Sequence, residues 1–150
     1  MTVYLINAPH EQRIPTREYG LVSCLAYSNP AYFESKSLAS DFGAIVIGDD
    51  VVVCRDSELK FVAKITEVID ATDASPGGRY EGEAVRLLKG KLTGRFNHVG
   101  VGAAAQRMHG EGTEPSRLIN ASRTGFKQGA FCEQLSADQA KSICSWLVST

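Results

Sequence analysis

Histidines and cysteines are the side chains of this sequence best suited to acid–base or nucleophilic chemistry. His98 and His109 lie in one basic stretch, where two imidazoles can act as an acid–base pair on a phosphodiester. The sequence contains no G-x-S-x-G, H-E-x-x-H or P-loop motif, so no spacing of residues indicates an established reaction. These observations favour a protein that binds its ligand without catalysis.

The four cysteines are far apart in the sequence, and none belongs to a C-x-x-C pair. A structural zinc site usually takes two ligands from one tight turn, so these cysteines are predicted to be reduced thiols, buried or free. Asp49 and Asp50 are interpreted as turn-capping residues rather than metal ligands. No metal and no cofactor is predicted. The cysteines are Cys24, Cys54, Cys132 and Cys144.

Charge is distributed unevenly along a chain whose formal net charge is -1. Residues 79–127 contain nine Lys or Arg and four Asp or Glu, whereas residues 1–78 contain six and eleven. A basic middle segment in a nearly neutral protein indicates a localised site for a phosphate-bearing partner, or charges scattered over a solvated face.

The length of 150 residues fits one domain, predicted to span residues 1–150. An apolar fraction of 43% and a charged fraction of 22% are typical of a globular protein. No apolar run approaches the roughly 18 residues of a membrane span. The first seven residues lack the basic and long apolar regions of a signal peptide, so we expect a cytoplasmic location.

The first half of the sequence predicts strands at residues 2–7 and 19–27, and a helix over 30–42 with Phe33, Leu38 and Phe42 facing inward. The apolar run 51–54, a polar turn and the strand 59–70 predict an antiparallel hairpin at the centre of a sheet. In its second strand we expect Phe61, Ala63 and Ile65 on one face, and Val62, Lys64 and Val68 on the other.

The second half predicts a strand at 80–92, a short helix at 99–108 and strands at 118–119 and 126–135. The sequence Ser136-Ala137-Asp138-Gln139 is typical of a capping box, and it predicts a final helix to about residue 148. Because strands and helices do not alternate regularly, the predicted class is α+β, a small mixed β-barrel with peripheral helices including a C-terminal helix.

Three segments resemble the PUA-like superfamily and, within it, the EVE and YTH domains. The first is Gly48-Asp49-Asp50-Val51-Val52-Val53, followed by Phe61-Val62-Ala63-Lys64-Ile65-Thr66-Glu67-Val68. The second is Tyr19-Gly20-Leu21-Val22-Ser23-Cys24. The third is Asn120-Ala121-Ser122-Arg123 with Leu135-Ser136-Ala137-Asp138-Gln139-Ala140.

The resemblance implies a module that holds a base, modified bases included, in a pocket, with basic residues around it for phosphates. The implied ligand-binding residues are Asn7, Val22, Ser23, Cys24, Asn120, Ser122 and Arg123. The implied phosphate-binding residues are Arg79, Arg95, Arg107, Arg117 and Lys127.

Aromatic side chains depart from the pattern of the methyl-base readers in this superfamily. The tryptophan expected after Tyr19-Gly20-Leu21 is replaced by Val22 and Ser23. The single tryptophan, Trp146, lies near the C-terminus, where a packing role is favoured. A core role is also favoured for the other aromatic residues near the implied pocket, which are Tyr27, Tyr80, Phe96 and Phe126.

Two alternatives to a nucleic-acid-binding module stay open. A protein that sequesters a small nucleotide, or inhibits another protein, would use the same basic pocket and show a shallow dependence of affinity on salt. A small phosphodiester-cleaving enzyme would show turnover that depends on His98 or His109.

Overall fold

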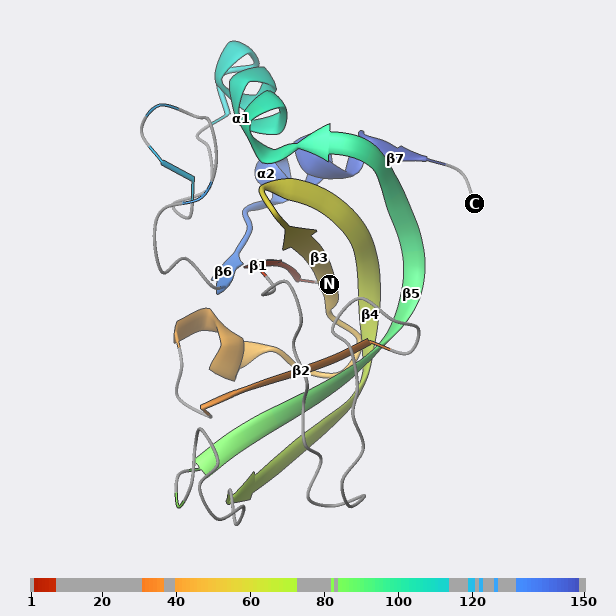
Figure 1. Ribbon diagram of the computed structural model, residues 1–150, viewed down its shortest axis with the longest axis vertical. Helices are drawn as coiled ribbons and strands as arrows, with labels where there is room; N and C mark the ends of the chain where they lie inside the picture. Colours follow the sequence, from red (N-terminus) through yellow and green to blue (C-terminus); the bar gives the residue numbers. More distant parts are fainter. Residues whose placement is uncertain are drawn as a thin grey trace.

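The computed structural model describes residues 2–7, 31–36, 40–72, 82, 84–113, 119–120, 122, 126 and 132–148. Its strands form one mixed sheet in the order β2-β5-β4-β3-β1-β6, with β7 paired to β5 (Figure 1). The strands are β1 (Val3–Asn7), β2 (Ala31–Lys36), β3 (Asp50–Arg55), β4 (Glu58–Thr72), β5 (Ala84–Gly100), β6 (Cys132–Gln134) and β7 (Leu147–Val148). The helices are α1 (Val101–Gly110), α2 (Ala137–Cys144) and the 3-10 helix η1 (Ser40–Ala44).

The predicted central hairpin is confirmed as β3 and β4, which pair antiparallel in the middle of the sheet. Asp56 and Ser57 form its two-residue turn, and both have positive φ, 52° and 59°. Turns of this kind match the right-handed twist of the strands that they join. The Val101 N–H at the start of α1 donates to the Ser57 carbonyl oxygen at 2.7 Å, so α1 fixes the tip of the hairpin.

Alternate residues of the central strands enter two hydrophobic clusters on opposite faces of the sheet. Val51 and Val53 belong to one cluster, together with side chains of β1, β2 and η1. Val52 and Cys54 belong to the other, which contains the buried residues of α1 and α2. Both faces of β3 are therefore covered, which explains its continuous apolar sequence.

The predicted alternation along β4 is confirmed for Phe61, Ala63 and Ile65, which share the first cluster, and for Val62, which lies in the second. The placement of Val68 was predicted wrongly, because it packs against the first cluster with Ile65. The pairing with β5 shifts register between Ile65 and Glu67. An extra residue in a ladder reverses the faces of all the residues that follow it.

The helix predicted over residues 30–42 is wrong. Residues 31–36 form β2, which pairs antiparallel with β5, and residues 40–44 form η1. Phe33 and Phe42 are buried as predicted, at 1% and 0% exposed, but from a strand and a 3-10 helix. The unpaired edge that β5 offers outweighs the local helix signals, because pairing satisfies the backbone groups of both strands.

Both predicted helices exist, but the last one is shorter than expected. The predicted 99–108 helix is α1, and Ser136 and Gln139 form the predicted capping box of α2. α2 ends at Cys144 instead of about residue 148, because Leu147 and Val148 pair with β5 as β7. The strand predicted at 80–92 is described from Ala84 and continues to Gly100.

The α+β class is confirmed, with a strongly curved sheet (Figure 1). β2 and β6 are the two ends of the pairing path and do not pair with each other in the described part, so the sheet is not closed. The predicted strand at 19–27 lies outside the described residues, as do residues 127–131 of the predicted strand 126–135. None of the helices described is long and apolar enough to cross a membrane.

Candidate nucleic-acid interface

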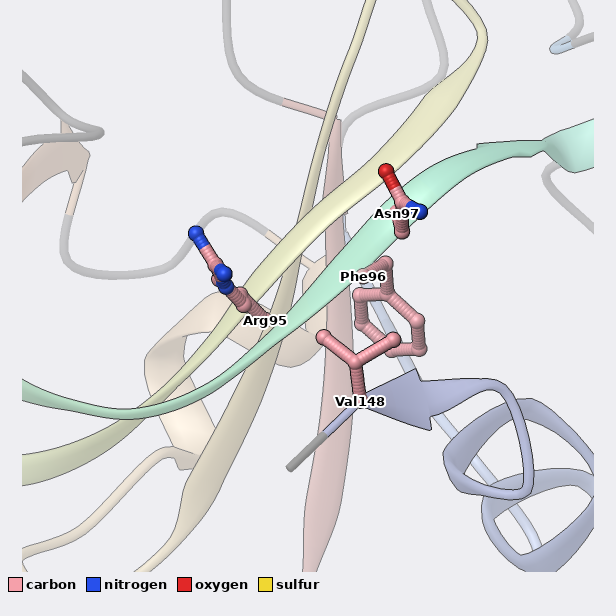
Figure 2. A pocket seen from close by; sticks show the side chains of 4 residues that line it. All are labelled: Arg95, Phe96, Asn97 and Val148. Carbon is pink, nitrogen blue, oxygen red and sulfur yellow. The ribbon is translucent and has the colours of Figure 1, made fainter. Parts of the chain in front are cut away.

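The second half of β5 carries two exposed polar side chains, Arg95 and Asn97, on either side of Phe96. Leu92 pairs with Ala63 and Gly94 with Val62, so Thr93 is an extra residue that shifts the faces of the strand. Beyond it Phe96 is buried in the second cluster, while Arg95 and Asn97 are exposed. Figure 2 shows both polar side chains pointing away from Phe96.

These residues line a hollow of about 230 Å³ together with Val148 of β7 (Figure 2). β7 reaches β5 because Gly94 leaves space for Leu147: a Cβ on Gly94 would lie 3.3 Å from a Leu147 methyl group. The hollow is smaller than the roughly 300–1,000 Å³ of pockets for drug-sized ligands. Its size and its cation suit one part of a larger ligand, such as a base or a phosphate.

Arg95 has no ion pair with a described residue, in contrast to Arg55, Lys64 and Arg86 of the same sheet. Lys64 lies 3.1 Å from the Asp50 carboxylate, and Arg86 lies 3.4 Å from that of Asp70. Arg86 also donates to the Phe42 and Gly43 carbonyl oxygens, so its role is structural. An exposed guanidinium without a carboxylate partner is well suited to bind phosphate.

Arg107 lies on α1, at a different hollow of about 280 Å³. Its guanidinium stacks over the Trp146 ring, 4.8 Å from the ring centre. Trp146 also packs against the second cluster, as predicted. The structure therefore does not bring Arg107 and Arg95 to one hollow. The residues lining the second hollow include both signs of charge: Arg107, Glu111, Thr113, Asp138, Lys141, Ser142 and Ser145.

The other predicted ligand-binding residues that the structure describes lie on separate segments. Asn7 is half-buried at the end of β1, opposite Cys54 of β3. The Ser122 hydroxyl donates to the Asn120 amide oxygen at 3.1 Å, beside the bridge between Ile119 and Phe126. The remaining predicted residues lie outside the described part: Val22, Ser23, Cys24, Arg123, Arg79, Arg117 and Lys127.

The aromatic residues Phe96 and Phe126 pack with the second cluster, in agreement with the favoured core role. The predicted turn-capping role of Asp49 is confirmed as well. Its buried carboxylate accepts the Val46 N–H at 2.9 Å, next to Gly48 at φ +96°. Within the described residues, no three His, Cys, Asp or Glu side chains are grouped to hold a metal ion.

Two of the cysteines are unsuited to nucleophilic chemistry, because they are buried in the hydrophobic clusters. Burial, with smaller effects of Asp41 and Glu133, raises the pKa of Cys132 to about 12. Burial also raises the pKa of the Cys54 thiol. Because the thiolate is the reactive form, both groups are inert at neutral pH.

The histidines considered as an acid–base pair lie at opposite ends of α1, His98 before its start and His109 in its last turn. His98 is exposed near the end of β5, and His109 is exposed in the last turn of the helix. At about 1.5 Å per residue, roughly 12 Å of helix lies between Val101 and His109. This separation gives no support to the phosphodiester-cleaving alternative.

Asn97 and Val148 line the hollow but were not singled out from the sequence. The strand prediction ended at residue 92, and Val148 was assigned to a helix. Alternation around the apolar Phe96 is the signal that would have placed Arg95 and Asn97 on one face. Which face of the sheet this is depends on Thr93, the extra residue in the pairing of β5 with β4. Local alternation does not reveal that pairing.

No protein-family model matches the sequence, and no curated protein matches it either. Solved structures match it in fold. Two variants of the ZmASCH protein from Zymomonas mobilis align with TM-scores of 0.57 and 0.59, at 6% and 7% identity, covering 97% of this chain and 99% and 96% of theirs.

The human THYN1 protein, in complex with DNA that contains 5-methylcytosine, aligns with a TM-score of 0.57 at 10% identity. The alignment covers 97% of this chain and 96% of THYN1. Likeness at such low identity concerns the fold alone. The chain therefore shares the fold of these solved structures.

Proposed function

We propose that this protein is a non-catalytic module that binds a nucleotide or nucleic acid, holding a base in a pocket and phosphates on a basic rim. The observation that carries the proposal is the hollow on β5, where Arg95 and Asn97 point outward without a described partner. Support from the fold comes from THYN1, which was solved with 5-methylcytosine-containing DNA. Modified bases are therefore part of the proposed ligand class.

The basic rim is tested by Arg95→Ala. Loss of one phosphate contact is expected to weaken binding of a labelled single-stranded oligonucleotide about tenfold, since hydrogen bonds to charged groups contribute roughly 1.5–3 kcal/mol. The slope of log affinity against log salt is expected to become shallower by about 0.7, the value for one released counterion. Fluorescence anisotropy over a potassium chloride series measures both quantities.

Lys141→Ala is the matched control, because it removes one exposed positive charge from α2 and leaves β5 unchanged. Its affinity and salt slope are expected to stay within twofold of the parent protein. Equal losses in the two variants would mean that net charge, not the β5 hollow, drives binding. Binding of free nucleotides alone, with little dependence on salt, would favour a sequestering protein instead.

The pocket implied by the family resemblance is tested by Asn120→Ala and Arg123→Ala. Both variants are expected to weaken ligand binding while leaving the melting temperature nearly unchanged. Lys141→Ala serves again as the control, because Lys141 is an exposed residue of α2 that is not among the implied ligand-binding residues. If Asn120→Ala and Arg123→Ala both unfold, those residues are structural and the pocket lies elsewhere. Direct binding and thermal melting of all three variants distinguish these outcomes.

A further inference from the structure

β5 carries a second irregularity just before α1. Arg95 pairs with Phe61 and Val99 with Leu59, so three residues of β5 lie opposite the single residue Lys60 of β4. Phe96 is buried and pairs with Leu147 of β7, which leaves Asn97 and His98 as the exposed part of the bulge. Bulges re-aim side chains and are frequent beside binding sites.

The backbone of this bulge is unusual at His98, whose φ of +53° lies in the left-handed region. A non-glycine residue in that region carries a conformational cost, which asparagine and histidine bear better than most residues. Pairing with β4 stops after Arg95 and resumes at Val99, directly after this left-handed residue. His98 therefore determines where the preceding side chain projects.

Asn97 is the polar residue that this geometry presents. Its side chain is exposed, lines the β5 hollow and makes no hydrogen bond to a described residue. An amide offers one donor group and one acceptor in the same plane, so it can form two hydrogen bonds to a base edge that presents a donor beside an acceptor, such as the amino group and ring nitrogen of adenine. Arg95, two residues earlier, also lines the hollow and points away from Phe96 (Figure 2), so its guanidinium is available to a phosphate of the same ligand.

We propose that Asn97 is the base-reading residue of the interface, forming two hydrogen bonds to a base edge that presents a donor beside an acceptor. Arg95 holds the phosphate without regard to sequence, and His98 is a positioning residue that acts through the backbone of the bulge. This inference rests on the proposed function, because it assigns a ligand class to the same hollow.

The test compares the parent protein with Asn97→Ala and Asn97→Asp on single-stranded oligomers of dA, of dC and of abasic nucleotides. The parent is expected to prefer dA or dC over the abasic oligomer by about 5- to 100-fold, the contribution of one good bidentate contact to a base. Both variants are expected to reduce that ratio to near one. Asn97→Asp has the same shape but lacks the amide donor, and taking a ratio of affinities cancels the effect of its added charge.

Arg95→Ala and His98→Asn complete the test. Arg95→Ala is expected to lower all three affinities by a similar factor and to keep their ratio. His98→Asn keeps a residue that tolerates positive φ, so the ratio is expected to survive. A preference unchanged in Asn97→Ala would overturn the base-reading role, and a ratio lost in His98→Asn would overturn the positioning role. If the parent binds none of the oligonucleotides, the proposed function itself fails.

Discussion

Replacing Phe33 by alanine is expected to lower the free energy of unfolding by about 3–5 kcal/mol, the usual cost of a phenylalanine cavity. Phe33 is 1% exposed, lies opposite Leu88 in the β2–β5 ladder and packs in the first cluster. Small domains have a total stability of roughly 5–15 kcal/mol, so this loss is a large fraction of it. Urea unfolding followed by circular dichroism measures the loss.

Val46→Ala is the matched control, since Val46 is 54% exposed on the turn before β3. Truncating an exposed side chain usually changes stability by less than about 0.5 kcal/mol. A cost below about 1 kcal/mol for Phe33→Ala would show that β2 does not pack on β5 as described. The comparison therefore tests the largest difference between the predicted and the observed secondary structure.

Stability is expected to fall steeply as the pH rises above 9. Cys54 and Cys132 keep their protons in the folded state because burial raises both pKa values, that of Cys132 to about 12 from the ordinary 9.0. Below pH 9 the thiols are protonated in both the folded and the unfolded state, so their titration takes nothing from the free energy of unfolding. Above pH 9 the thiols ionise first in the unfolded state. Each thiol then lowers the free energy of unfolding by up to about 1.4 kcal/mol per pH unit.

Urea unfolding at pH 8, 9, 10 and 10.5, with a reducing agent, measures this slope. The double variant Cys54→Ala, Cys132→Ala is expected to reduce the slope of unfolding free energy against pH by about 2–3 kcal/mol per pH unit. The two small cavities are expected to lower its stability by the same amount at every pH. Other groups that titrate in this range, such as Tyr4, whose pKa burial also raises, are the same in both proteins. Parallel stability curves would show that the thiols are not protonated in a buried site.

The parts of the fold that the sequence predicted correctly are those specified by neighbouring residues. The β3–β4 hairpin needs only two apolar runs and the turn between them, which Asp56 and Ser57 form. The start of α2 needs four consecutive residues, because Ser136 and Gln139 cap each other. In both cases the interacting groups are close in the sequence, so the pattern contains the contact.

The parts that failed depend on distant partners. β2 forms because residues 31–36 pair with residues 85–90 of β5, and the local signals for a helix carry no information about that edge. β7 forms for the same reason at the other end of β5. Bulges at Ile65 and Thr93 arise from the fit of two long curved strands, which reverses the side-chain faces that simple alternation predicts.

The site shows the same division. Arg95 was predicted to bind phosphate because it is a cation in a basic segment, and the structure places it at the β5 hollow. Arg107 has the same charge, yet the fold stacks it over Trp146 beside a different hollow. Asn97 was missed because its position depends on the bulge at His98 and on pairing with β4.

The position of β1 has a consequence for how this chain reaches its native state. β1 pairs with β3 on one side and with β6 on the other, so Tyr4, Leu5 and Ile6 meet residues 132–134 from almost the opposite end of the sequence. During synthesis β1 stays unpaired on this side until residues 132–134 have been made. Such non-local closure favours folding in milliseconds to seconds rather than microseconds, and it leaves an aggregation-prone edge exposed until β6 pairs with it.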